Sequence, residues 1–200
     1  MLATSGRFSD ESILNPDSSA TSARPASLTN GSQQVVSTGS SEAAITANLK
    51  SLIQVHVDAG SDLQDLHIAM HPQTALHLAQ LLTSGNVRAF PSLGARGGDV
   101  WGIPVLTTVG AVCSGSPTEK VIAVLNAQGC LLADEAPIRI EATNRAAIQQ
   151  DNATTQSSAT GTSTSVVSLF QAHATGIKFV RPINFARSHT TAVSYMRTNY

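Results

Sequence analysis

The chain has 200 residues, of which 42% are hydrophobic, and this suffices for one main domain with a real core. Only 12% of the residues are charged, about half the usual share, while Ser, Thr, Asn and Ala are abundant. With a formal net charge of -1, the surface must be mostly neutral and polar. Such a surface suits packing against copies of the same chain, and it also suits a neutral secreted or adhesive domain.

The cysteines and the apolar runs exclude several protein classes. Cys113 and Cys130 are the two cysteines, and they have neither C-x-x-C spacing nor a dense framework. This argues against a disulfide scaffold and a zinc site and favours free thiols. The first residues lack an apolar signal sequence, and the longest apolar stretch is interrupted by Gly, Pro and Thr. We therefore expect no signal peptide and no membrane span.

Residues 1–41 are rich in Ser, Thr, Asn and Gly and show no useful periodicity, so they are expected to form a tail or linker. The exception is segment 34–37, which predicts a short edge strand. A helix is predicted over 42–58, because apolar residues recur there at helical spacing after an acidic first turn. Gly60 follows as its terminator.

Alternating apolar residues over 66–70 predict a strand that ends at a His-Pro pair. The proline begins a helix predicted over 72–84, with Gly85 placed to close it. The segment 90–99 is too glycine-rich for regular structure, so we expect a projecting surface loop.

Further strands are predicted at 100–106, 121–125 and 138–141, where short β-branched runs are bounded by Gly, Pro or Asp. Trp101, the only tryptophan, is expected to be largely buried on the first of these strands. Residues 151–165 have low complexity and are expected to form a mobile loop. The chain ends in three segments that predict strands, or a strand, a helical turn and a strand: 165–171, 176–182 and 191–195.

His67 and His71 lie four residues apart and His77 follows, which raises a metal site as an alternative. Pro72 places the first two across a strand-to-helix junction, and no acid or cysteine lies at ligand spacing. Capping and packing roles are therefore favoured, and no metal site is predicted.

A serine or cysteine hydrolase would need a nucleophile on a sharp, glycine-flanked turn. Cys113, followed by Ser-Gly-Ser, is the nearest candidate, but it has no G-x-S-x-G elbow and no assignable triad. The glycines of 94–98 precede a strand instead of a helix with Lys-Ser or Lys-Thr, so they do not indicate phosphate binding. The acidic pair at 134–135 is expected to be a solvated turn. No catalytic residue and no cofactor is predicted.

The segment 152–200 is weakly basic, because Asp151 is the last acidic residue of the chain. Its four cations are spread over the segment without a basic run: Lys178, Arg181, Arg187 and Arg197. They could face packaged DNA or an acidic patch on a neighbouring subunit, but the pattern is too sparse for a dedicated nucleic-acid site.

The order of these segments resembles the major capsid proteins of tailed phages, which have the Hong Kong 97 fold. In that family an apolar strand ending in Met-x-Pro, a helix and a Gly-x-Pro-Val strand follow one another. Here Met70-His71-Pro72 and Gly102-Ile103-Pro104-Val105 stand in those places. The segments 168–171, 177–181 and 191–193 resemble the stretch in which the family's chain returns from the central A domain to the peripheral P domain.

The resemblance implies an α+β fold with a short central mixed sheet flanked by the helices at 42–58 and 72–84. Residues 42–165 would form an A-domain-like core and residues 166–200 the C-terminal P-domain-like strands. The implied function is that of a structural subunit of a phage or prophage capsid and not of an enzyme. Its partners would be copies of itself in pentamer and hexamer contacts, with weak non-specific contact to packaged DNA and none to a membrane. Its location would be the virion, and the host cytoplasm before assembly.

In the family the A domains converge around five-fold and six-fold axes, which makes loop 91–99 a candidate contact, with Leu93, Arg96 and Asp99 as candidate residues. Family members begin with an arm, an E-loop and a spine helix, for which about forty residues are too few, so a truncated or processed portion is expected. Such a portion would be a monomer or a concentration-dependent ring of five or six copies. A nanocompartment shell protein of the same fold is the alternative, and a small serine or cysteine hydrolase is a weaker one.

Overall fold

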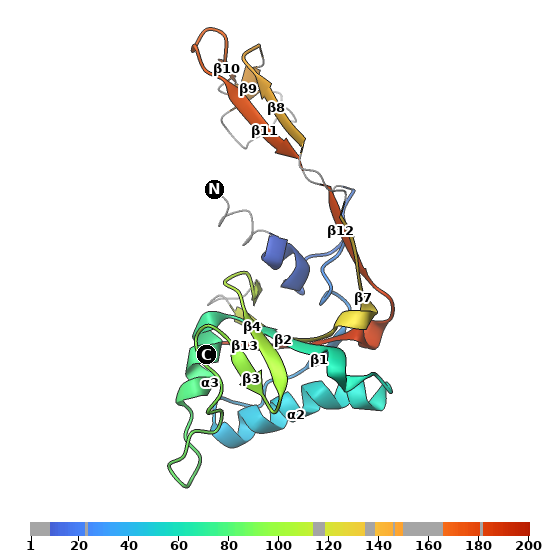
Figure 1. Ribbon diagram of the computed structural model, residues 1–200, viewed down its shortest axis with the longest axis vertical. Helices are drawn as coiled ribbons and strands as arrows, with labels where there is room; N and C mark the ends of the chain where they lie inside the picture. The colour runs from blue at the N-terminus through green and yellow to red at the C-terminus, as the bar shows by residue number, and fades with distance from the viewer. Residues whose placement is uncertain are drawn as a thin grey trace, which may run out of the picture. The chain divides into compact units, whose positions relative to one another are not determined.

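The computed structural model describes residues 9–22, 24–113, 119–134, 139–145, 147–149, 166–180 and 182–200, and Figure 1 labels the elements. The chain divides into two compact units. The first consists of Met1–Ala133 and Asn184–Tyr200, and the second of Asp134–Ile183. The predicted mobile loop 151–165 lies outside the described residues. Across the described part of the chain, no helix has the length and apolarity needed to span a membrane.

A seven-stranded mixed sheet forms the centre of the first unit, in the order β1-β13-β6-β2-β4-β3 with β5 paired to β6. The pairs β1–β13 and β2–β4 are parallel, and the others are antiparallel. This sheet and its helices confirm the predicted α+β class. The strands are β1 (Gln33–Val35), β2 (Leu66–Met70), β3 (Gly98–Val100), β4 (Ile103–Thr107), β5 (Val112–Cys113), β6 (Glu119–Asn126) and β13 (Val193–Thr198).

Helix α2 (Glu42–Asp58) has the bounds that the sequence predicts. The Ser41 side chain accepts a hydrogen bond from the Ala44 amide at 3.3 Å, and Glu42 lies in the first turn, where a negative charge favours the helix dipole. The buried face follows the predicted helical spacing and consists of Ile45, Asn48, Leu49, Leu52 and His56.

Helix α3 (Pro72–Gln80) begins as predicted, with the proline at its first position and the His71 side chain accepting from the Gln73 amide at 3.1 Å. The predicted end at residue 84 is wrong. The chain becomes extended at Leu81, and the next residue pairs with Arg88 in an antiparallel bridge, which satisfies the backbone outside the helix. Both helices pack on one face of the sheet, since their apolar residues share one core cluster with β2, β6 and β13.

The N-terminal segment covers the other face of the sheet (Figure 1). Residues 9–14 are helical, and Leu14 and Leu28 are 5% and 8% exposed against small and β-branched side chains of the strands. Much of the predicted tail is thus built into the first unit. The sequence did not predict this packing, because single apolar residues separated by polar loops produce no hydrophobic periodicity.

The predicted strand 100–106 is in fact a hairpin, β3–β4, whose turn is Trp101-Gly102. Both turn residues have positive φ, 53° and 81°, as in the type I′ turn of two-residue hairpins. The prediction that Trp101 is largely buried is wrong, since the side chain is 53% exposed. The turn places it beyond the end of the strands, whereas the preceding Val100 is 1% exposed in the core.

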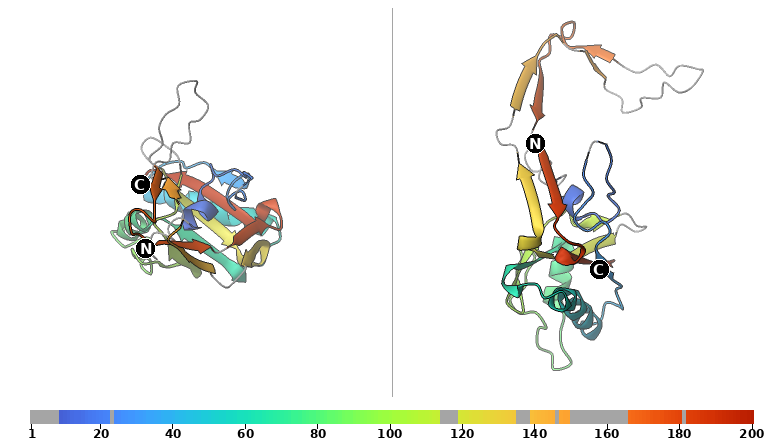
Figure 2. Two further views of the ribbon diagram at one scale, coloured as in Figure 1. Left: turned by 90° about the horizontal axis from the view of Figure 1, so that it is seen from above. Right: turned by 90° about the vertical axis from the view of Figure 1, so that its right-hand side faces the viewer.

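The second unit consists of strand pairs, which Figure 2 shows from two further directions. Strand β8 (Arg139–Thr143) pairs with β11 (Gly176–Val180), and β9 (Ala147–Gln149) pairs with β10 (Val166–Ser168), both antiparallel. The predicted strands at 138–141, 165–171 and 176–182 are confirmed in part. A further pair, β7 (Cys130–Asp134) with β12 (Ile183–Arg187), was not predicted, and all of it except Asp134 and Ile183 belongs to the first unit.

Candidate self-association surface

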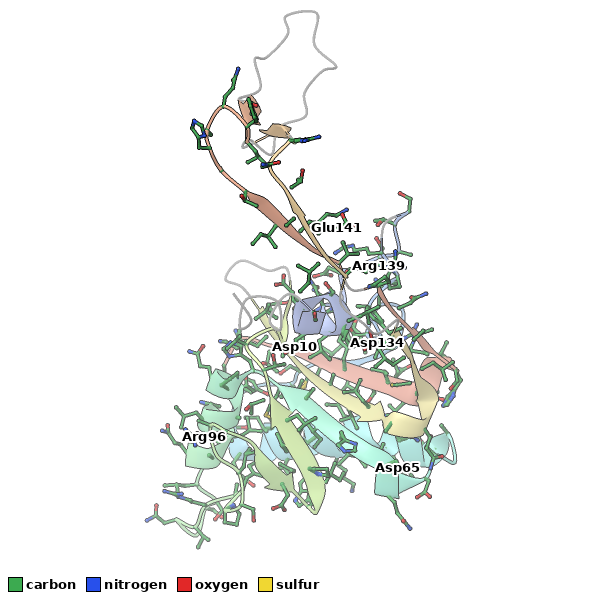
Figure 3. All side chains as sticks on the ribbon, turned by 45° about the horizontal axis from the view of Figure 1, so that its top comes forward. Asp10, Asp65, Arg96, Asp134, Arg139 and Glu141 are labelled. Carbon is green, nitrogen blue, oxygen red and sulfur yellow. The ribbon has the colours of Figure 1, made fainter. Side chains whose placement is uncertain are left out.

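The loop that contains the predicted contact residues is anchored in the core of the first unit. Phe90 and Leu93 are 4% and 5% exposed and belong to the core cluster beneath α2 and α3. Gly94 and Gly97 exchange two backbone hydrogen bonds, at 2.9 and 3.0 Å, which close a tight turn. Arg96 lies exposed within this turn and is labelled in Figure 3.

Two glycines allow the loop to lie directly against its neighbours. A Cβ atom on Gly97 would lie 2.4 Å from the Val105 carbonyl oxygen, and one on Gly98 would lie 2.0 Å from the Ser92 carbonyl oxygen. Both glycines also have positive φ, +104° and +140°. The glycine-rich composition, which predicted a loop without regular structure, therefore encodes close packing and the start of β3.

The three predicted contact residues differ in exposure. Arg96 and Asp99 are exposed, the second on the edge strand β3, whereas the side chain of Leu93 is buried. Leu93 can support the turn from within the core, and the other two side chains are accessible to a partner. Their role in subunit contacts stays a prediction.

A second loop, residues 82–88, was not predicted from the sequence, because its first residues were included in the predicted helix 72–84. Its ends are joined by the bridge between Leu82 and Arg88, and Asn86 has a positive φ of 58°. Leu82 and Val87 are 50% and 65% exposed. In Figure 1 the green loop between α3 and β3 extends away from the sheet. The Gly85-Asn86 pair, a typical turn sequence, was the available signal.

The three histidines considered for metal binding make separate contacts. His71 caps α3, the Nδ1 atom of His67 lies 3.2 Å from the Asp65 carbonyl oxygen, and the His77 ring packs on Tyr200 with centroids 5.1 Å apart. No group of three His, Cys, Asp or Glu side chains suited to a metal ion occurs within the described ranges. The favoured capping and packing roles are confirmed for His71 and His77.

Cys113 is not activated as a nucleophile. It is 3% exposed, and its thiol lies 3.7 Å from the Glu119 carbonyl oxygen and 3.8 Å from its carboxylate. Burial raises the pKa of the Cys113 thiol to about 11; Arg197 opposes this shift, and Glu119 and Asp17 add to it. The thiol is therefore protonated at neutral pH, the form that does not act as a nucleophile.

The cations of the weakly basic C-terminal segment have partners within the structure. Arg197 forms ion pairs with Asp17 at 2.6 Å and with Glu119 at 3.7 Å. Arg187 donates to a backbone carbonyl at 2.8 Å, and Lys178 lies 3.8 Å from a carboxylate. The fourth cation, at position 181, lies outside the described residues. Of the described cations, Arg197 is thus neutralised by two carboxylates, whereas Arg187 keeps its charge.

Residues 6–161 match the phage capsid family. The chain belongs to this family. The resemblance carried by Met70-His71-Pro72 and the Gly102–Val105 segment is thereby confirmed. A capsid polyprotein of Pseudomonas phage PAJU2 is 30% identical over 172 residues, which cover 86% of this chain and 25% of that protein.

Solved structures share the fold of this capsid-family chain over 98% of its length. Chains from Gordonia phage Cozz and Mycobacterium phage Ogopogo have TM-scores of 0.63 and 0.59 at 12% and 13% identity. A chain from the capsid of an empty GTA particle, computed with C5 symmetry, has a TM-score of 0.61 at 10% identity. The capsid-family chain spans 60%, 66% and 63% of these three structures, respectively, and a quarter of the polyprotein. The predicted Hong Kong 97-type fold is confirmed.

Proposed function

We propose that the chain is a structural subunit of a phage or prophage capsid, which associates with copies of itself into capsomers that enclose DNA. The observation that carries the proposal is the match of residues 6–161 to the phage capsid family. On this proposal the protein resides in the virion, and in the host cytoplasm before assembly. The similar chain from the capsid of an empty GTA particle belongs to an assembly of copies, which supports self-association.

The turn at residues 94–97 and the edge strand β3 of the first unit present exposed side chains that support this function. The turn that presents Arg96 is closed by its own hydrogen bonds and held from below by Leu93. Asp99 extends the same surface on the edge strand. A backbone turn that is already closed loses little backbone entropy when a partner binds, and this favours specific contacts. The division into an A-domain core of 42–165 and P-domain strands of 166–200 stays a proposal, and the two compact units divide the chain elsewhere, since β13 lies in the sheet of the first unit.

The same proposal assigns no catalytic activity to the chain. Burial keeps the Cys113 thiol protonated, because it raises the pKa, so the nearest candidate nucleophile lacks the thiolate that hydrolysis would require. Panels of ester and peptide substrates should show no turnover above buffer. Turnover that disappeared in Cys113→Ala would contradict the structural role.

Self-association is tested on the purified chain by light scattering and negative-stain electron microscopy over a range of concentrations. We expect a monomer, or rings of five or six copies that form as the concentration rises. A surface with few charges and few large apolar patches makes small contacts, and interfaces below about 1,200 Å² are weak. A tight dimer that persists on dilution would contradict the capsid proposal, since two-fold closure leaves no surface for a larger ring.

A further inference from the structure

Trp101 has a backbone conformation that tryptophan rarely adopts. Its φ of 53° lies in the left-handed region, where a bulky side chain is an outlier. Asn86 also has positive φ, but asparagine tolerates this conformation. A type I′ turn favours Asn-Gly, so the turn between β3 and β4 does not itself require tryptophan at the position before Gly102.

The Trp101 side chain is also only partly buried within its own subunit. It is 53% exposed, and its ring contacts Phe90 with centroids 6.1 Å apart. Strained residues persist mainly where function selects them, and tryptophan is among the residues most enriched at the energetic centres of protein interfaces. We propose that Trp101 is the anchor of a contact between two copies of this chain, an inference that rests on the proposed self-association.

The loop that precedes Phe90 in the chain carries further exposed side chains. Phe90, which the Trp101 ring contacts, directly follows the loop whose residues Leu82 and Val87 are 50% and 65% exposed. Arg88 closes that loop and is exposed as well. Exposed aromatic, aliphatic and arginine side chains within one stretch of the chain, residues 82–101, have the composition of an interface centre.

The charge pattern favours a second copy as the partner. The loop before the turn carries Arg88 and Arg96, with Asp99 on β3 beside the turn, whereas residues 51–65 contain three Asp and no Lys or Arg. Each copy therefore presents a basic stretch and an acidic stretch. When two copies meet, the arginines of one can lie against the carboxylates of the other, while the tryptophan is buried between them.

The test uses the whole chain and its single tryptophan as the reporter. Sedimentation velocity is recorded over one concentration series for the parent, for Trp101→Asn and for the control Val36→Asn, and tryptophan fluorescence is recorded for the parent and the control. Val36 is 74% exposed and follows β1, at the opposite edge of the sheet from β3. The control therefore removes a similarly exposed apolar side chain from another surface.

The parent's emission moves to shorter wavelength over the concentration range in which oligomers form. Trp101→Asn weakens association by about tenfold or more. Its Tm stays within about 3 °C of the parent, because Asn-Gly suits the turn. Val36→Asn associates as the parent does.

Oligomers with unchanged emission, or a Trp101→Asn variant that associates normally, overturn the proposed anchor and leave the capsid function standing. A large fall in the Tm of Trp101→Asn assigns the side chain a structural role and overturns it too. A parent chain that stays monomeric at every soluble concentration overturns the anchor, whereas a tight dimer that persists on dilution overturns the proposed function.

Discussion

At the scale of single residues, burial controls the titratable groups in the core of the first unit. His56 is fully buried on α2, where its Nε2 atom lies 3.2 Å from the Ser194 hydroxyl oxygen. That hydroxyl donates its proton to the Leu52 carbonyl at 3.0 Å, so Nε2 must be the donor toward it. Burial lowers the pKa of His56; a backbone hydrogen bond at Val124 opposes the shift, and His189 adds to it. His56 is therefore neutral at pH 7.

This pKa predicts a stability that falls with acidification. Because the folded-state pKa of His56 lies below its ordinary value of 6.5, the unfolded chain takes up the proton first as pH falls. The contribution is complete above about pH 6.5 and is lost as pH falls toward the folded-state value. Urea unfolding at about pH 7.5 and about pH 5 measures it. His56→Gln should reduce the difference in unfolding free energy between the two conditions, and the control His173→Gln, at an exposed position of the second unit, should not.

The raised pKa of Cys113 predicts an inert thiol. At about pH 8 a pKa of about 11 leaves roughly one thiol in a thousand ionised, and the side chain is also buried. Alkylation by iodoacetamide, followed by mass spectrometry, should leave Cys113 unmodified in the native chain and modify it in denaturant. Rapid modification of the native thiol would show that β5 opens readily or that the pKa is not raised.

At the scale of elements, a helix boundary could be predicted only where a residue next to it determines the boundary. The capping residue Ser41 and the proline at the start of α3 act within one turn, so the helix starts were predictable from sequence. The end of α3 was not, because the leucines after Gln80 continue the helical spacing, and the bridge from Leu82 to Arg88 interrupts it. The same limit applies to the hairpin turn at Trp101, where a two-residue reversal interrupts an apolar run.

The glycine-rich loop yields a prediction at this scale. Gly98→Ala should lower the free energy of unfolding by on the order of 3 kcal/mol, because the new methyl would meet the Ser92 carbonyl oxygen at a positive φ. The matched control is Gly60→Ala, which has a φ of +68° and nothing within 4 Å, and which should cost about 1 kcal/mol. Chemical denaturation measures both. Equal costs would mean that the loop does not lie tightly on its neighbours.

At the scale of the molecule, the N-terminal segment and the last strand form one structure. Arg197 on β13 pairs with Asp17, which lies 180 positions away, and β1 adds to the same strand in parallel register. The segment closes the sheet face that the helices leave uncovered, and small residues such as Ala69 and Ala123 let its chain approach closely. Composition could not indicate this, since the pairing partners are at opposite ends of the sequence.

A tail and a packed segment respond differently to truncation of a leucine. Leu28→Ala should lower the free energy of unfolding by about 2 kcal/mol, because Leu28 is 8% exposed and packs on Ala192 and Val193. Val36→Ala, at a position 74% exposed, should change it by less than about 0.5 kcal/mol. If both substitutions changed the free energy of unfolding by a negligible amount, residues 9–32 would be a linker and not a packed segment.

The sequence by itself determined the capsid family, the bounds of α2, the strand at 66–70 and the start of α3. Each of these depends on neighbouring residues, such as the alternation that ends at Met70 and the proline that follows it. Of the candidate contact surface, it determined Arg96 and Asp99 as exposed positions. Tertiary structure alone decided that Leu93 is buried, that Trp101 is exposed and strained, and that the N-terminal segment covers a face of the sheet. The physical reason is that burial and backbone strain are set by contacts between distant parts of the chain, which composition and periodicity do not contain.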